Sequence, residues 1–404
     1  MIPVSEAIEI ISREVTPLGV ESVALVGSVG RTLAEPVVAD TDMPPFDRSQ
    51  MDGYAVRAAD TANAPVLLRL VGESAAGRGW HRYLNSGEAV AIMTGAPLPD
   101  GADAVQKIEL TDRDINAEIT SDSKVKMLEP TEIGRYIVRA GSEIKQGEIL
   151  FSSGTLIKES MIAALAAFGY ATVMVGRQSK VTILGTGSEI VAIDQVPGRD
   201  QIRNSNSAML SVMAAKCGAY PEIRPNVEDD ISALRTQISE AANDTDVLII
   251  TGGVSVGKYD LTKTAIADLG AEIFFEKVRL KPGKPAVFGR IGKTLIFGLP
   301  GNPVSAAVTF HLFVRLALAI MQGRVQPGPK TGTAVLASHV RAARERDTYL
   351  PCKLTGDEKG RLIAEPLRWQ GSSDFVGFAQ ADALIVMARG TAREAGEVVS
   401  IEYL

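Results

Sequence analysis

Three glycine-rich segments in the middle of the chain could hold an anion. They span 185–189 (GTGSE), 251–257 (TGGVSVG) and 298–303 (GLPGNP), and each follows an apolar run that is typical of a strand. If these strands are parallel, the three turns share the carboxyl edge of one sheet, where open α/β sheets bind ligands. Backbone N–H groups in such turns can hold a phosphate or another oxyanion. One such turn would indicate only a tight connection, but three at one edge predict a binding crevice.

Carboxylates lie beside these turns. Glu189 belongs to the first turn, Asp229 and Asp230 follow a strand expected at 220–226, and Asp260 follows the turn at 251–257. Oxygen ligands beside a phosphate site suggest Mg²⁺, which proteins hold with few carboxylates and with substrate oxygens. Each acid could instead cap the start of a helix, and Asp230 and Asp260 have the position for it.

Two lysines lie in a stiff segment at 281–285 (KPGKP). Because prolines restrict the backbone, the directions of the Lys281 and Lys284 ammonium groups are limited, which suits an anion better than a pair of solvated side chains. A surface loop remains the alternative.

A hydrolase is the main alternative from the residues alone. The segment 253–257 matches G-x-S-x-G, so Ser255 could act with Asp268 and with His311 or His339. Two features weaken this interpretation: the following helix is expected to begin only near Asp260, and no upstream H-G-G-G segment supplies an oxyanion hole.

Alternating strands and helices must position these residues. Apolar runs at 180–186, 246–251 and 294–299 predict strands, and helices are expected at 206–217, 230–242, 260–269 and 303–321. This alternation predicts a parallel sheet covered on both faces. Short strands between glycine and proline turns are expected before this block and again in the last 75 or so residues.

Composition excludes several classes of protein. The chain has 404 residues, 46% of them hydrophobic, and a net charge of −6, which argues against non-specific binding to nucleic acid. Two cysteines and three histidines, none closely paired, make a zinc site improbable and fit a reducing compartment. The N-terminus does not have the pattern of a signal peptide, and the longest apolar run is interrupted by His311 and Arg315, so we expect a cytoplasmic protein with no membrane contact.

Seven segments, taken in order, resemble the molybdopterin molybdenumtransferase family (MoeA-type proteins and the E domain of gephyrin). They are PPFDRSQMDGYAV, MTGAPLPDGADAVQ, ILGTGSEI, the RN of QIRNSN, TGGVSVGKYDLTK, RLKPGKPAVFG and GLPGNPVSAAVTF, and they begin at residue 44 and end near residue 310. The flanking regions are also compatible, so the resemblance covers nearly the whole chain.

The resemblance implies a reaction. The family takes adenylylated molybdopterin and molybdate (or tungstate) with Mg²⁺, releases AMP, and leaves the metal on the pterin dithiolene. It implies that Glu189, Asp229 and Asp260, together with Asp52, act in catalysis and hold Mg²⁺, and that Thr94 also acts in catalysis. It further implies that molybdate or phosphate binds Lys281, Lys284 and Ser372. The residues expected to hold pterin or nucleotide are Gly187, Asn204, Gly252, Gly253, Ser255, Gly257, Pro300, Gly301 and Asn302.

The family also implies a homodimer whose site lies between subunits. Asp52 and Thr94 would reach the partner's α/β domain, and Asp52 would position Mg²⁺ or water. Glu143 and Arg346 are further candidates by position. Contact with the upstream adenylyltransferase is also expected.

Two other functions stay open within this resemblance. The molybdopterin adenylyltransferase shares the G-G-x-S-x-G turn but lacks the segment at 44–55, and a gephyrin-like scaffold would not need the retained acids and lysines.

The expected architecture is a multidomain α/β and β protein. A discontinuous linker domain (1–45 and 138–177) contains an inserted β-rich domain (46–137). A MogA/MoaB-like α/β domain with a parallel sheet follows (178–325), and a small C-terminal β-barrel domain ends the chain (326–404).

Overall fold

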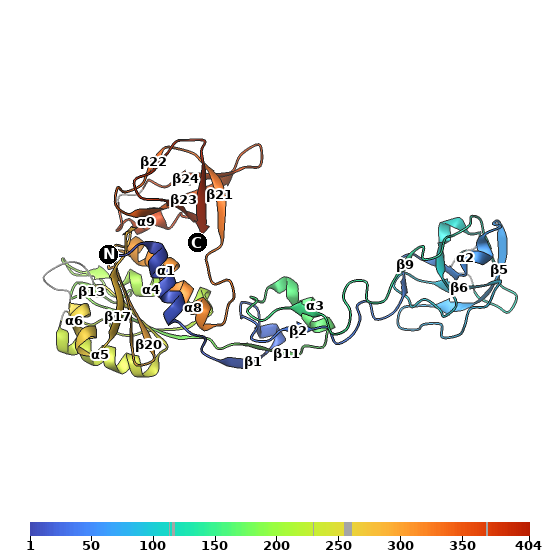
Figure 1. The fold of residues 1–404 in the computed structure, drawn as a ribbon, viewed down its shortest axis with the longest axis horizontal. Helices are drawn as coiled ribbons and strands as arrows, with labels where there is room; N and C mark the ends of the chain where they lie inside the picture. The colour runs from blue at the N-terminus through green and yellow to red at the C-terminus, as the bar shows by residue number, and fades with distance from the viewer. Residues whose placement is uncertain (113, 115–117, 229, 254–260, 369–370) are drawn as a thin grey trace. The chain divides into compact units, whose positions relative to one another are not determined.

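The computed structural model describes residues 1–112, 114, 118–228, 230–253, 261–368 and 371–404 (Figure 1). It contains two compact units. Unit 1 consists of Met1–Glu35, Ser153–Ile162 and Ala171–Leu404, and unit 2 consists of Pro36–Ser152 and Ala163–Tyr170.

A six-stranded sheet forms the centre of unit 1, in the order β15-β12-β16-β20-β19-β17. Four of its strands are parallel: β12 (Lys180–Gly185), β15 (Tyr220–Ile223), β16 (Val247–Thr251) and β20 (Thr294–Leu299). The predicted alternation of strands and helices is therefore confirmed. The sequence did not reveal one antiparallel strand, β19 (Pro285–Ile291), which pairs with β20 and with β17 (Glu272–Lys277).

Helices cover both faces of this sheet (Figure 1). On one face lie α1 (Val4–Glu14), α4 (Ser205–Lys216) and the helical run formed by α7 (Pro303–Thr309), a π-helical turn (Phe310–Val314) and α8 (Arg315–Met321). On the other lie α5 (Ile231–Asp244) and α6 (Leu261–Asp268). Alternate residues of β16 enter the two cores, since Val247 and Ile249 pack on the first face and Leu248 and Ile250 on the second.

The helical run Pro303–Met321 is apolar along its whole length. Among the residues that the structure describes, it is the one helix long and apolar enough to cross a membrane, with a mean hydropathy of 1.9. However, 89% of it is buried inside the protein, which is the situation of a core helix.

The C-terminal strands close into a five-stranded barrel. Its strands are β21 (Thr331–Leu336), β23 (Asp347–Gly356), β24 (Leu362–Pro366), β25 (Ala383–Met387) and β27 (Val398–Tyr403), and the pairing of β23 with β25 completes the circle. Strand β18 (Leu280–Lys281) comes from the α/β block and pairs with β23, so it joins the predicted lysine segment to the barrel.

Unit 2 is built on a five-stranded sheet in the order β7-β4-β6-β5-β8. Its strands are β4 (Gly53–Val56), β5 (Val66–Ser74), β6 (Glu88–Ile92), β7 (Ala104–Lys107) and β8 (Lys124–Met127). The expected fold class, a MogA/MoaB-like α/β domain with β-rich domains, is confirmed.

Shorter elements complete the two units. The paired strands are β1 (Val20–Ala24) with β11 (Thr172–Gly176), β2 (Val37–Val38) with β10 (Ile149–Phe151), β3 (Arg48–Ser49) with β9 (Ile137–Val138), β13 (Ile190–Val191) with β14 (Ile202–Arg203), and β22 (Val340–Arg341) with β26 (Ala392–Arg393). The short helices are α2 (Ala58–Thr61), α3 (Ile162–Ala167) and α9 (Phe375–Phe378), with 3₁₀ turns at Leu25–Gly27, Ile108–Leu110 and Glu159–Met161.

Candidate active site

The turns that follow β12, β16 and β20 touch one another at the carboxyl edge of the sheet. Thr186 N donates to Thr251 O at 3.0 Å, and Gly252 N donates to Leu299 O at 3.3 Å. A Cβ atom at Gly301 would lie 3.6 Å from Gly252 Cα. The structure thus brings three segments that are far apart in sequence to one place.

Two glycines are required at this edge. Gly252 has φ +100° and Gly253 has φ +61°, and side chains strain the backbone in this region. A Cβ at Gly252 would overlap Thr186 O, and one at Gly253 would lie 2.5 Å from Thr262 Oγ1. The backbone here approaches its neighbours more closely than any side chain permits.

Buried polar atoms around this turn lack hydrogen-bond partners in the described part of the chain. They are Thr186 Oγ1, Asn206 Oδ1 and Thr262 Oγ1, and their residues are at most 9% exposed. Most buried polar atoms in proteins are satisfied, so unpaired ones indicate water or a ligand.

Asn206 joins two of the turns, and it was not among the residues predicted for the site. Its side-chain amide Nδ2 donates to Thr251 Oγ1 at 3.0 Å and to Gly301 O at 2.8 Å. Thr251 Oγ1 in turn donates to Pro300 O at 3.2 Å. The N-S-N-S order of residues 204–207, at the start of the helix expected at 206–217, is the one signal that could have drawn attention to it.

Asn204 caps α4 close to the first turn. Its Oδ1 accepts from Ser207 N at 3.0 Å, and its Nδ2 donates to Asn226 Oδ1 at 2.6 Å. Both polar atoms of the Asn204 side chain, Oδ1 and Nδ2, are therefore already bonded to protein. Asn204 shapes the site through α4 and through Asn226.

Glu189 lies over Gly187. A Cβ at Gly187 would lie 2.5 Å from Glu189 Oε2, and Gly187 has φ +141°. Glu189 is exposed, and no partner of its carboxylate exists among the described residues. An acid without a partner beside a glycine turn is free to bind a ligand or a cation.

Asn302 and Ser372 meet at the third turn. Asn302 Nδ2 donates to Ser372 Oγ at 2.9 Å, and Val304 N donates to Ser372 O at 3.1 Å. Asn302 precedes α7, with Pro303 as its first residue, as the sequence predicts. A segment of the C-terminal domain therefore covers the start of α7.

Three basic residues lie on adjacent strands and turns: Lys281, Lys284 and Arg346. Lys281 pairs with Thr348 across β18 and β23, and Arg346 precedes β23 directly. The side chains of these three cations make no hydrogen bond or ion pair within the residues that the structure describes. A Cβ at Gly283 (φ +110°) would lie 2.6 Å from Thr309 Cγ2, so glycine lets this turn pack against α7.

Unit 2 brings Asp52 and Thr94 together. Asp52 Oδ1 accepts from Thr94 N at 2.6 Å and from Thr94 Oγ1 at 2.7 Å. These bonds hold the pKa of Asp52 below its usual range, the backbone N–H contributing most. Glu143, also in unit 2, lies on the surface with Arg48 Nη2 3.5 Å from its Oε1.

Four predicted residues lie outside the described part of the chain: Asp229, Ser255, Gly257 and Asp260. The structure does describe the other groups that a hydrolase would need, and they have other partners. His311 Nε2 lies 3.1 Å from Glu402 Oε2, His339 Nδ1 lies 3.0 Å from Glu394 Oε1, and Asp268 lies 3.4 Å from Arg235. Asp268 therefore orients neither histidine, as the expected set of Ser255, Asp268 and a histidine would require.

Asp230 caps α5, because its Oδ1 accepts from Ala233 N at 2.7 Å. We expect Asp230→Ala to lower the free energy of unfolding by about 1 kcal/mol through loss of this cap, with activity unchanged. Chemical denaturation and a turnover assay of the same preparation would check both. A large loss of activity at unchanged stability would instead show a role for Asp230 in the site.

Carboxylate and hydroxyl oxygens at the edge suit Mg²⁺. Within the described residues, no group of three or more His, Cys, Asp or Glu could hold a metal ion. Mg²⁺ needs only one or two carboxylates when phosphate oxygens complete its coordination. Glu189, whose carboxylate has no partner among the described residues, is the acid at this edge that could supply one such ligand.

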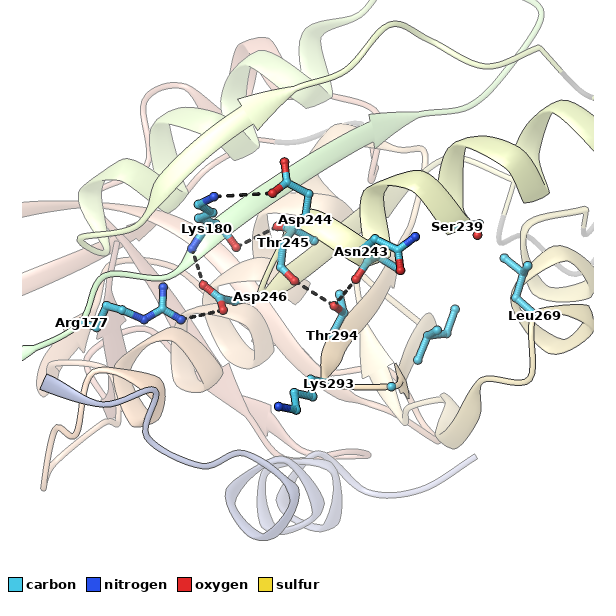
Figure 2. Close-up of a pocket in the computed structure, with 13 residues that line it drawn as sticks. Arg177, Lys180, Ser239, Asn243, Asp244, Thr245, Asp246, Leu269, Lys293 and Thr294 are labelled. Atoms are coloured by element: carbon cyan, nitrogen blue, oxygen red, sulfur yellow. Dashed lines mark hydrogen bonds and ion pairs between the residues drawn. The ribbon is translucent and has the colours of Figure 1, made fainter.

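The opposite, amino edge of the sheet carries a pocket of about 530 Å³ whose polar groups bind one another (Figure 2). Asp246 accepts from Arg177 Nη2 and from Lys180 N, each at 2.8 Å. Thr294 Oγ1 donates to Ala242 O at 2.7 Å and to Thr245 O at 2.8 Å. These bonds connect the starts of β12, β16 and β20, so this pocket has a structural role.

Three family models match nearly the whole chain. The MoeA N-terminal region (domain I and II) matches residues 2–169, a probable molybdopterin binding domain matches 182–319, and the MoeA C-terminal region (domain IV) matches 333–404. The molybdopterin molybdenumtransferase of Bacillus subtilis (strain 168) is 35% identical, with 99% of this chain and 93% of that protein covered. The chain belongs to the molybdopterin molybdenumtransferase family.

Other members agree with this assignment. The molybdopterin molybdenumtransferase of Staphylococcus aureus (strain COL) is 32% identical over 99% of this chain and 95% of that protein. The crystal structure of the molybdopterin biosynthesis MoeA protein from Pyrococcus horikoshii matches with a TM-score of 0.82 at 32% identity, covering 100% of this chain and 99% of that one. The expected family is confirmed, and the protein is a transferase of molybdenum in molybdenum cofactor biosynthesis.

Proposed function

We propose that this molybdenumtransferase inserts molybdate into adenylylated molybdopterin with release of AMP. The observation that carries the proposal is the contact of three glycine-rich turns at one sheet edge, where Thr186, Asn206 and Thr262 have buried oxygens without protein partners. Such an edge suits a phosphoanhydride, since backbone N–H groups and hydroxyls can bind its oxygens.

Each group then has a role. Gly252, Gly253, Asn302 and the neighbouring turns hold the nucleotide and pterin phosphates. Lys281, Lys284 and Arg346 hold molybdate, which cations without protein partners can bind as counter-ions. Ser372 positions Asn302 through their hydrogen bond.

Glu189 would hold Mg²⁺, with Asp229 and Asp260 as further expected ligands. When bound, this ion would neutralise charge on the phosphoanhydride. Asp52 accepts a proton from, or orients, the water that cleaves this bond, and Thr94 keeps Asp52 ionised for that purpose. The site is completed in a cytoplasmic homodimer, where Asp52 and Thr94 act on the partner's sheet edge and the upstream adenylyltransferase delivers the substrate.

Incubation with adenylylated molybdopterin and Mg²⁺ tests this proposal. We expect AMP release that depends on molybdate and that tungstate supports in its place, because the two oxyanions are similar in size and charge. If ATP and free molybdopterin yield the adenylylated product instead, the chain catalyses the earlier step. If neither reaction occurs in the folded dimer, the scaffold function replaces the proposed one.

A further inference from the structure

A largely apolar groove runs between α4 and the helical run Pro303–Met321 in unit 1. It encloses about 740 Å³, and its lining includes Met209, Met213, Phe310, Phe375, Phe378 and Tyr403. This volume is within the range of pockets that hold small molecules.

Two arginines line the same groove without an acidic partner. Arg315 donates to two neutral carbonyls, His311 O at 3.0 Å and Gly328 O at 3.1 Å, and its Nη2 is buried and unpaired. The side chain of Arg324 makes no hydrogen bond or ion pair in the described part of the chain, and its Nε is buried. Burial keeps the pKa of both groups below its usual range, but guanidinium groups remain charged in proteins.

No acidic side chain among the described residues that line the groove neutralises the charges of Arg315 and Arg324. Lys216 and Lys330 add two more cations, although Lys216 Nζ donates to Leu404 O at 3.4 Å and Lys330 lies over the ring of Tyr403 at 5.0 Å. Glu402 is the nearby acid that acts on Arg315, and its carboxylate already lies 3.1 Å from His311 Nε2. Because burying unpaired charge is costly, a groove of this kind favours an anion.

This anion is not the proposed substrate. Helices rise 1.5 Å per residue, so Arg315 lies roughly 18 Å along the helical run from Pro303, which begins at the glycine turns, and Arg324 lies beyond the end of the run. The two arginines are therefore well removed from the sheet edge that carries the candidate active site.

We propose that this groove binds a small amphipathic anion, with its carboxylate or phosphate head at Arg324 and Arg315 and its apolar body along Met213, Met209 and Phe310. The apolar lining supplies affinity through burial of the body, and the guanidinium groups select the charged head. Ser205 and Pro303 also line the groove, so its apolar end reaches toward the sheet edge while its charged end lies at the two arginines.

Fluorescence of 8-anilinonaphthalene-1-sulfonate bound to the folded chain tests the proposal, with decanoate, decanol and decyltrimethylammonium as competitors. We expect decanoate to displace the dye and the other two to do so at least tenfold more weakly. Arg324→Gln should weaken decanoate about tenfold, because a charge-assisted bond is lost. Arg344→Gln, which removes an exposed arginine elsewhere in unit 1, should have no effect.

Three results would overturn the proposal. The first is equal competition by decanol, and the second is unchanged decanoate binding in Arg324→Gln. The third is binding that appears only when dilution dissociates the protein into monomers, because a second copy of the chain would then be the occupant of the groove in the undiluted protein. Met213→Gln provides a second variant, and it should weaken decanoate without altering the far-ultraviolet spectrum.

Discussion

Asp52→Asn should lower molybdate-dependent AMP release by about 100-fold or more, while the protein remains folded. The substitution keeps the size of the side chain but removes its charge, and preorganised charged groups at reacting centres are worth about 10²–10³ in rate. Asp52 is exposed, and among the described residues its carboxylate accepts hydrogen bonds from Thr94 alone. The fold therefore depends little on the charge of Asp52. Initial rates at saturating substrate, with far-ultraviolet circular dichroism of each variant, measure both effects.

Asp100→Asn is the matched control, because Asp100 is an exposed acid of the same unit whose side chain has no partner in the described chain. It should keep the wild-type rate. Equal rates for Asp52→Asn and wild type would remove Asp52 from the mechanism and leave it a purely structural acceptor for Thr94.

The hydrogen bonds from Thr94 also set a pH dependence. They stabilise the ionised form, so the pKa of Asp52 is lowered and the wild-type enzyme keeps an ionised Asp52 as the pH falls. Thr94→Val removes the hydroxyl donor but keeps the backbone donor. Its acid limb should therefore move to higher pH, toward the ordinary carboxyl range, without reaching the loss seen in Asp52→Asn.

The sequence was sufficient for features that local patterns determine. Alternating apolar runs and helix patterns predicted β12, β16, β20 and their helices, and parallel connectivity then placed the glycine turns at one edge. Only the family resemblance placed Asp52 and Thr94 in one site, because their contact joins two loops 42 residues apart.

Long-range side-chain contacts explain what the sequence could not predict. Asn206 is important because its amide reaches Thr251 and Gly301, and nothing in the local pattern around α4 encodes those partners. Strand β19 was missed for a different, local reason. A two-residue turn joins it to β20 and makes it antiparallel, although its apolar pattern resembles that of the parallel strands.

Gly252→Ala should abolish measurable turnover and lower the free energy of unfolding of unit 1 by about 3 kcal/mol. The expected destabilisation has two parts, since a side chain at φ +100° costs about 1–2 kcal/mol and overlap with Thr186 O costs a similar amount as overpacking. Relief of this overlap must move the turn after β12 away from the turn after β16, which also breaks the alignment of Thr186 and Asn206 with a bound phosphate.

Gly270→Ala separates the two contributions. Gly270 has φ +75°, but a Cβ there would meet nothing within 4 Å, so this variant carries only the backbone strain of about 1–2 kcal/mol. It should keep its activity and lose about half as much stability as Gly252→Ala in chemical denaturation. If the two variants are equally stable and equally active, the turns at the sheet edge tolerate movement, and the close contact of their backbones has no part in binding. If Gly252→Ala alone loses activity, the reaction depends on that contact, because strain alone would have affected both variants.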